Sequence, residues 1–212
     1  GPGMRTIFSA GDDGRFIAYD IAKDRVIPIK TSRPISAAGV AIDRMSYFIA
    51  HEKKADIIQY DIMGRKLKSF LGHIDQITDI LVTIDRKYII SSSEDKTVRI
   101  WEIRSGKELF AFKDHRWTVT DIATDPLGKY LVSGSLDGTV HLYHLKNREL
   151  IKTFNLAGYK INALAFSPNY TNIAVAAQKD ESSDFAGYFL LETNLKHRAV
   201  KIPKRYIIKK QP

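Results

Sequence analysis

The sequence predicts an all-β protein built from repeated four-stranded units. Three observations lead to this fold class. Features recur every 41 or 42 residues, apolar and polar residues alternate with a period of two, and turn residues separate the short runs. No stretch keeps a 3.6-residue period, so we expect little helix. Four short strands per unit at this repeat length indicate the blades of a β-propeller.

The repeat is clearest between residues 88–112 and 130–154. Tyr88 matches Tyr130 and Asp95 matches Asp137, each 42 positions apart. Two positions recur through four units: an apolar one at Ile35, Ile77, Val119 and Ile161, and an aromatic one at Tyr19, Tyr60, Trp101 and Tyr143.

The unit around Trp101 shows how each set of strands is expected to run. Its strands are predicted at about 77–83, 87–92, 97–103 and 108–112. In the third, Thr97 and Arg99 alternate with Val98 and Ile100. Turn residues separate the strands at Glu94-Asp95-Lys96 and Ser105-Gly106.

The repeat predicts one propeller domain, residues 4–212, of about five blades. Gly1-Pro2-Gly3 before Met4 is interpreted as a cloning scar and excluded. The first blade begins with its second strand, Met4–Ala10, and lacks a first strand. The blades are expected at 4–30, 35–70, 77–112, 119–154 and 161–202, followed by a basic strand or tail at 203–212.

Two explanations of the missing strand stay open. The strand-like run Arg205–Lys209 would supply it and close a five-bladed ring. Alternatively the chain is a piece of a larger propeller, whose open edges need a second copy or a partner. We favour the second explanation slightly, and an open ring would make a homo-oligomer an expected state.

Two spacings link the units to a known family. Gly72-His73 lies 28 residues before Trp101-Glu102, counted from His73, and Asp114-His115 lies 28 residues before Tyr143. In this the chain resembles WD40 repeats over nearly its whole length. The resemblance implies a buried hydrogen-bonded tetrad in each of two blades: His73, Ser91, Asp95 and Trp101, then His115, Ser133, Asp137 and Tyr143.

A His, Ser and Asp set also suggests a hydrolase, but two facts favour a structural role. The set recurs in successive blades, which a single active site would not do, and no Gly-x-Ser-x-Gly elbow is present. Hydrogen bonding within such a set satisfies buried polar groups, each costing about 1–3 kcal/mol if left unpaired. We therefore expect no enzyme activity.

Other units depart from the pattern. The unit 35–70 has Thr31 where the histidine would fall, so its tetrad is expected to be absent. The last unit has Tyr159 at that place. It also carries a polar insertion at 178–184, between its second and third strands. Such an enlarged turn is either a functional addition or a tolerated surface insertion.

A propeller of this kind is expected to be a scaffold that presents its turn face to protein or peptide partners, as a subunit of a multiprotein complex. Arg116 and Trp117 are the predicted anchors, since Trp and Arg dominate interface energies; the alternative for Trp117 is packing on its own blade. The predicted face also takes in Pro34 and Ser36, Asp12, Gln76, Thr78 and Glu94, Thr118, Thr120 and Leu136, and Lys160 and Asn162.

Composition excludes several other classes. The chain of 212 residues has no cysteine, so disulfides, Cys-ligated metals and thiol catalysis are ruled out. His51 and His197 have no partner at a ligand spacing, and His141 and His144 point to opposite faces of one strand. Gly-x-Gly occurs only in the scar, so we expect neither metal nor cofactor. No apolar run would span a membrane and no secretory segment is evident, so we expect a cytoplasmic protein, with the nucleus as the alternative.

The formal charge of +9 comes mostly from the end of the chain. Seven basic residues and no acidic one lie between Leu195 and Pro212, leaving +2 for the rest. They form a solvated strand edge or, alternatively, contact nucleic acid in a ribonucleoprotein. A resemblance of residues 167–170 and the insertion to the WD40 subunit of eukaryotic translation initiation factor 3 is consistent with the latter; an accessory factor of a bacterial complex fits as well. The seven are Lys196, Arg198, Lys201, Lys204, Arg205, Lys209 and Lys210.

Overall fold

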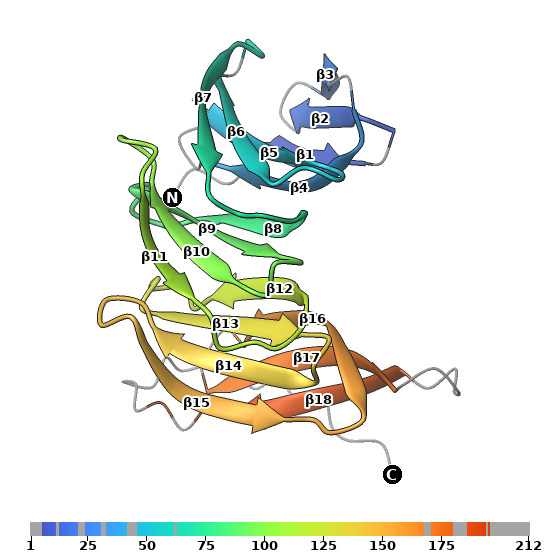
Figure 1. Ribbon diagram of the computed structural model, residues 1–212. Helices are drawn as coiled ribbons and strands as arrows, with labels where there is room; N and C mark the ends of the chain where they lie inside the picture. Colours follow the sequence, from blue (N-terminus) through green and yellow to red (C-terminus); the bar gives the residue numbers. More distant parts are fainter. Residues whose placement is uncertain are drawn as a thin grey trace.

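The fold is a series of antiparallel sheets that follow one another along the chain (Figure 1). The computed structural model describes residues 6–11, 13–20, 24–30, 33–41, 46–61, 63–167, 171–179, 186–193 and 195. Within these residues there are five sheets and no helix. The predicted all-β class is confirmed.

Each sheet is a meander in which neighbouring strands are consecutive in the chain. The first holds β1 (Thr6–Ala10), β2 (Arg15–Asp20) and β3 (Arg25–Lys30). The second holds β4 (Ile35–Val40), β5 (Ser46–His51), β6 (Asp56–Asp61) and β7 (Lys66–Leu71). The third holds β8 (Ile77–Val82), β9 (Tyr88–Ser93), β10 (Val98–Glu102) and β11 (Glu108–Phe112). The fourth holds β12 (Val119–Thr124), β13 (Tyr130–Ser135), β14 (Thr139–His144) and β15 (Glu149–Asn155). The fifth holds β16 (Tyr159–Phe166), β17 (Asn172–Lys179) and β18 (Ala186–Glu192).

Strand register shows which strands correspond between the sheets. The recurring aromatic of the third strand pairs with a second-strand residue in four sheets, and a bulge precedes that aromatic on its outer side in β6, β10 and β14. Because β1 pairs with the strand that carries the aromatic Tyr19, it corresponds to the second strand of the other sheets, as the repeat predicts. The pairs are Ile7 with Tyr19, Tyr47 with Tyr60, Ile89 with Trp101, and Leu131 with Tyr143.

Threonines lie at two of the strand boundaries that differ from the predicted ones. The third strand of the unit around Trp101 begins at Val98, after Thr97, whose N–H and hydroxyl donate to the Asp95 carboxylate in the turn. The first strand ends at Val82, before Thr83, whose hydroxyl donates to Asp85 in the next turn. Periodicity assigns both threonines to strands, since threonine is a good strand former.

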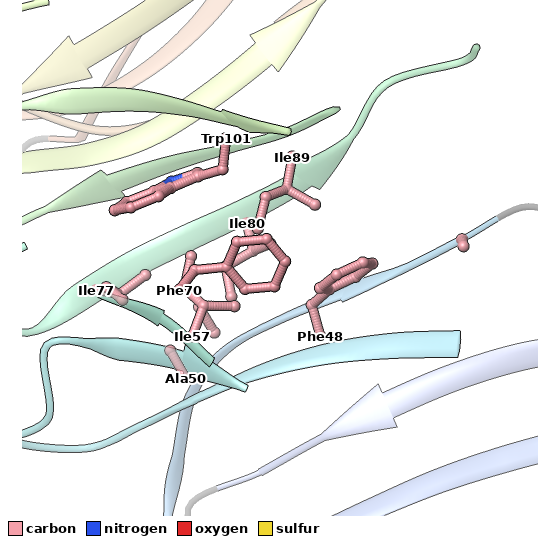
Figure 2. Close-up of a cluster of buried hydrophobic side chains, with 10 residues drawn as sticks. Phe48, Ala50, Ile57, Phe70, Ile77, Ile80, Ile89 and Trp101 are labelled. Atoms are coloured by element: carbon pink, nitrogen blue, oxygen red, sulfur yellow. The ribbon is translucent and has the colours of Figure 1, made fainter. Parts of the chain in front are cut away.

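The hydrophobic core lies between successive sheets, whose first strands β4, β8, β12 and β16 are neighbours. Between the second and third sheets, Phe70 packs edge-on against both Phe48 and Trp101, with ring centroids 5.8 and 6.2 Å apart (Figure 2). Ile57 and Ile80 complete this cluster. Aromatic pairs at such distances contribute stability beyond their buried area.

One glycine sets how closely the fourth and fifth sheets approach. A Cβ on Gly134 would lie 2.5 Å from Cγ2 of Ile161 and 2.8 Å from Cδ2 of Leu164. Any larger residue would push these sheets apart, because core atoms are already close-packed. Gly134 therefore fixes the blade spacing at this junction.

Candidate functional site

The third blade contains a hydrogen-bonded relay that joins its turns to its second and third strands. Trp101 Nε1–H donates to Ser91 Oγ at 2.9 Å, and Ser91 Oγ lies 2.8 Å from His73 Nε2. His73 Nδ1 lies 2.7 Å from the Asp95 carboxylate. The relay that uses each donor once runs from the indole to the serine, then the imidazole, then the carboxylate. The structure thus brings the four residues implied by the WD40 resemblance into contact.

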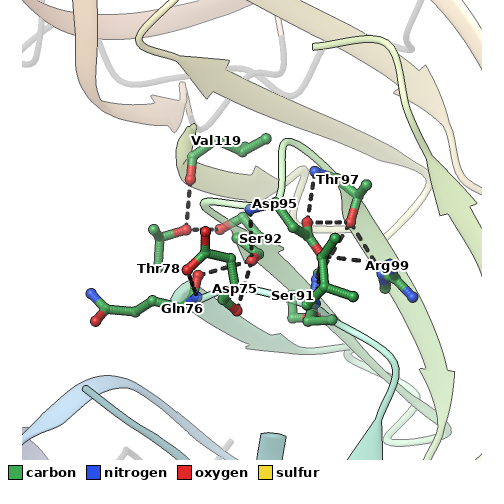
Figure 3. Close-up of polar contacts among 12 residues, drawn as sticks. Asp75, Gln76, Thr78, Ser91, Ser92, Asp95, Thr97, Arg99 and Val119 are labelled. Atoms are coloured by element: carbon green, nitrogen blue, oxygen red, sulfur yellow. Dashed lines mark hydrogen bonds and ion pairs between the residues drawn. The ribbon is translucent and has the colours of Figure 1, made fainter. Parts of the chain in front are cut away.

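The Asp95 carboxylate accepts hydrogen bonds from several donors. Burial alone would raise the pKa of Asp95, but hydrogen bonds from His73 and Thr97 outweigh burial and hold that pKa well below its usual value. Arg99 Nη2 lies 3.4 Å from the same carboxylate (Figure 3). Asp95 therefore stays ionised within the folded blade at neutral pH.

The fourth blade builds a shorter version of this cluster. His115 Nε2 lies 2.6 Å from Ser133 Oγ, while His115 Nδ1 lies 3.1 Å from the Thr139 hydroxyl and 3.5 Å from the Asp137 carboxylate. Asp137 in turn accepts from Thr139. Among the described residues the buried hydroxyl of Tyr143 makes no well-aligned hydrogen bond. Burial raises the pKa of this hydroxyl, Asp114 raises it further, and the nearby Ser133 hydroxyl lowers it. The tyrosine therefore fills the place of Trp101 in space and brings its hydroxyl near Ser133, but without the well-placed donor that the indole provides.

A second histidine packs on this cluster. The rings of His115 and His141 lie 4.2 Å apart between centroids. Burial, followed by the neighbouring His115, lowers the pKa of His141 to about 4. His141 is accordingly uncharged at neutral pH and serves as a packing residue, with Nδ1 bonded to the Thr153 hydroxyl at 2.9 Å.

Neither cluster has the accessibility of an active site. Ser91 and Ser133 are completely buried, and His73 and His115 are nearly so. A nucleophile must reach its substrate, so these hydroxyls cannot act on an outside molecule in this conformation. What the arrangement does is satisfy polar groups inside the blades and fix the turns that precede the first strands.

Those turns carry the exposed pair Arg116 and Trp117. Trp117 is 56% exposed, so a large part of its surface is open to a partner. Its backbone is held firmly, because Trp117 O accepts from Ser135 Oγ and the Arg116 N–H donates to Asp137 at 2.7 Å. A large exposed aromatic on a rigid turn next to an arginine has the composition of an interface anchor.

Other residues predicted for this face serve the contacts between blades. The Thr78 hydroxyl donates to Val119 O at 2.6 Å (Figure 3). The Thr120 hydroxyl donates to Ile161 O at 2.8 Å. Gln76 accepts from the Lys53 N–H at 2.7 Å. These three side chains therefore tie neighbouring blades together rather than project freely to a partner.

The remaining predicted face residues differ in exposure. Pro34, Glu94 and Asn162 are exposed, whereas Ser36, Thr118, Leu136 and Lys160 are half-buried. Ser36 occupies the place of Thr78 and Thr120, yet its buried hydroxyl has no hydrogen-bond partner among the described residues. Asp12 and the whole basic patch, from Lys196 to Lys210, lie outside the described residues.

The structure contains a pair of carboxyl groups, on the first strands of the third and fourth blades, that is not among the residues predicted for the site. Asp79 of β8 lies beside Asp121 of β12, and each accepts from the next backbone N–H at 2.7 and 2.9 Å. Burial, together with the facing Asp121, raises the pKa of Asp79 to about 7. The signal for this pair is in the sequence, because Asp79 and Asp121 recur at the 42-residue spacing.

Metal and membrane sites were sought over the same part of the chain. Where the structure describes it, no group of three His, Asp or Glu side chains is arranged to hold a metal ion. No helix there has the length and apolar character of a membrane span.

Comparison with known proteins identifies the repeats. The family model described as WD domain, G-beta repeat matches residues 64–102 and 106–144, which contain most of the third and fourth sheets. A search of curated proteins finds no match to the chain. Such repeats are generally interaction scaffolds without enzyme activity. Their match to the two tetrad-bearing blades shows WD40 repeats at residues 64–102 and 106–144, and the five antiparallel sheets in series are consistent with blades of the β-propeller type.

Proposed function

We propose that this protein is a non-enzymatic scaffold that binds a protein or peptide partner through Arg116 and Trp117, as a subunit of a larger complex in the cytoplasm or nucleus. One observation carries the proposal: the indole of Trp117 stands 56% exposed on a turn whose backbone is fixed from both sides. A rigid anchor of this kind binds at a low entropic cost, because little conformational freedom is lost on contact.

The neighbouring cluster explains the rigidity of this turn. Asp137 accepts the Arg116 N–H and the Thr139 N–H, and Leu136 donates to Thr118 O at 3.0 Å. The cluster inside the blade and the exposed pair on its turn are therefore parts of one unit. The buried His115 fixes the start of the turn, and the turn fixes the backbone of Trp117.

The experiment is affinity capture with quantitative mass spectrometry on three forms of the full chain. Arg116→Ala with Trp117→Ala should lose the partners that the wild type retains. The control, Met63→Ala, removes a still more exposed apolar side chain on another blade and should retain them. Equal partner recovery by the double variant and the control would overturn the proposal.

The nucleic-acid alternative rests on the charge of the last residues alone. A fall of RNA affinity with salt, lost when Lys201, Lys204 and Arg205 are neutralised, would favour it over protein binding, because phosphate contacts release counterions. RNA binding that is absent or independent of salt would discard it.

A further inference from the structure

A pocket of about 350 Å³ lies between the third and fourth blades, at the end of the strands opposite to Trp117. Its apolar lining includes Ile84, Leu109, Leu127 and Leu145, and the exposed side chains of Lys146 and Arg148 contribute to it as well. The volume is at the lower end of the range for binding sites, which suits one or two side chains better than a cofactor.

Strand register explains why the pocket occurs at this junction. Lys68, Phe110 and Lys152 occupy the same place on the outer strands β7, β11 and β15, since they pair with Gln59, Ile100 and Leu142. Where a lysine stands there, it spans the junction to the next blade. Lys68 Nζ donates to the carbonyls of Ile103 and Arg104 at 2.9 and 2.6 Å, and Lys152 Nζ donates to that of Glu192 at 3.2 Å.

Phe110 has no polar group that could donate a hydrogen bond to a carbonyl of the next blade. The carbonyls that correspond to those of Ile103 and Arg104 belong to Leu145 and Lys146, and both residues line the pocket. Instead, the guanidinium of Arg148 lies over the Phe110 ring, 5.5 Å from its centroid, and Nη1 reaches Leu109 O at 3.5 Å. The junction is therefore bridged weakly and from the opposite side, which leaves an apolar gap.

The charge around the pocket is basic. Asp85 is the acidic residue of the lining, and its carboxylate already accepts from the Thr83 hydroxyl and the Lys87 N–H. The Lys146 ammonium makes no ion pair among the described residues. An incoming carboxylate would thus meet two cations, Lys146 and Arg148, near an apolar surface.

We propose that this pocket binds a partner-protein segment in which an aliphatic side chain of leucine size stands beside a carboxylate. The aliphatic group enters between Leu127 and Leu145, and the carboxylate pairs with Lys146 and Arg148 at the edge. Walls are partly preformed, because Ile84 and Gly128 already meet across the blades: a Cβ on Gly128 would lie 3.3 Å from Ile84 Cγ2. The site is separate from the Arg116 and Trp117 face and does not depend on it.

Fluorescence polarisation with labelled peptides tests the ligand side. The probe GSDLEGS should bind the full chain. Replacing its leucine by alanine should weaken binding about tenfold, as expected for losing a buried aliphatic side chain. Replacing its two acids by lysine should weaken binding about threefold, as expected for exposed ion pairs. No binding of GSDLEGS at millimolar concentration, or equal binding of the three peptides, would overturn the proposal.

Matched variants test the protein side. Leu127→Asp places a charge at the pocket wall and should abolish binding of GSDLEGS. Leu71→Asp changes an equally exposed leucine elsewhere and should bind as the wild type does. Lys146→Glu with Arg148→Glu should reverse the preference toward the lysine-flanked peptide. If Leu127→Asp and Leu71→Asp bind alike, the pocket is not the site.

Two further variants separate folding and the other face from this site. Phe110→Lys installs the spanning lysine of the adjacent junctions, so it should close the pocket and lose the peptide while the circular dichroism of the fold is retained. Its melting temperature should fall, because the Phe110 ring packs on the core and under the Arg148 guanidinium. Arg116→Ala with Trp117→Ala should bind GSDLEGS unchanged. Loss of peptide binding in that double variant would place the site on the other face instead.

Discussion

The third and fourth blades carry related clusters that differ at the aromatic of the third strand and at the partner of the histidine. In the third blade Trp101 donates to Ser91 and starts an unbroken relay to Asp95. In the fourth, His115 Nδ1 lies nearer the Thr139 hydroxyl than the Asp137 carboxylate. Tyr143 keeps the packing role, with its ring 4.1 Å from that of Phe112 between centroids, but among the described residues its hydroxyl makes no well-aligned hydrogen bond. The comparison shows that the aromatic has two separable tasks, to fill the space between sheets and to satisfy the serine.

The largest effect should come from deleting the imidazole of the complete relay. His73→Ala would leave a cavity and remove one hydrogen bond each from Ser91 and Asp95, so we expect a loss of about 4 kcal/mol of unfolding free energy. His115→Ala should cost less, about 2 kcal/mol, because His115 Nδ1 lies 3.5 Å from the Asp137 carboxylate, whereas His73 Nδ1 lies 2.7 Å from that of Asp95. Urea unfolding of both variants measures the difference, and equal losses would show that continuity of the relay contributes nothing.

Two sets of carboxylates should make the stability of the fold depend on pH in opposite directions. One set is Asp95 and Asp137 of the clusters, and the other is Asp79 of the first strand. The pKa values of Asp95 and Asp137 are lowered in the fold, so the stability they supply is present above their usual pKa near 4 and is lost as the pH falls below it. The pKa of Asp79 is raised to about 7, so the fold loses stability as the pH rises from about 4 to about 7.

Asp79→Asn isolates the second effect. The amide keeps an acceptor for the Ile80 N–H but cannot ionise. We expect the variant to exceed the wild type by on the order of 2 kcal/mol at pH 8 and to match it near pH 4. Thermal melts across this range test the sign, and a gap that widens toward acid pH would contradict it.

The junction lysines should give a smaller effect. Lys68→Met keeps the aliphatic stem and removes two hydrogen bonds to the next blade, so we expect a loss of about 1 kcal/mol. Lys152→Met removes one longer bond and should cost less. Differential scanning calorimetry of the pair provides the measurement, with each variant serving as the other's control. A larger loss in Lys152→Met would show that the number of hydrogen bonds to the next blade does not determine the effect, since both variants keep the aliphatic stem.

The features of the structure that can be predicted from the sequence are those that recur from blade to blade. The 42-residue period carries each blade onto the next, and the WD40 resemblance then implies the tetrad positions from His73 to Tyr143. Spacing does not show that Thr139 takes the place beside His115, since a threonine at a strand start looks like any strand former. Lys68, Phe110 and Lys152 also recur at 42 residues, so the exchange of a lysine for Phe110 can be seen in the sequence. The pocket cannot, because the repeat does not show which side chains leave a gap between two blades.

The smallest expected effect has the opposite sign and tests the comparison most directly. Tyr143→Phe removes a buried hydroxyl that makes no well-aligned hydrogen bond among the described residues, and it leaves the ring in place. Burial raises the pKa of Tyr143 far above its usual value and outweighs the nearby Ser133 hydroxyl, which lowers it. Because burying an unpaired hydroxyl is costly, we expect a gain of up to about 1 kcal/mol. Trp101→Phe, the matched change in the third blade, should be destabilising, because it leaves Ser91 Oγ without its indole donor. Urea unfolding of both variants gives the two signs, and a loss in Tyr143→Phe would mean that the hydroxyl of the fourth blade is paired after all.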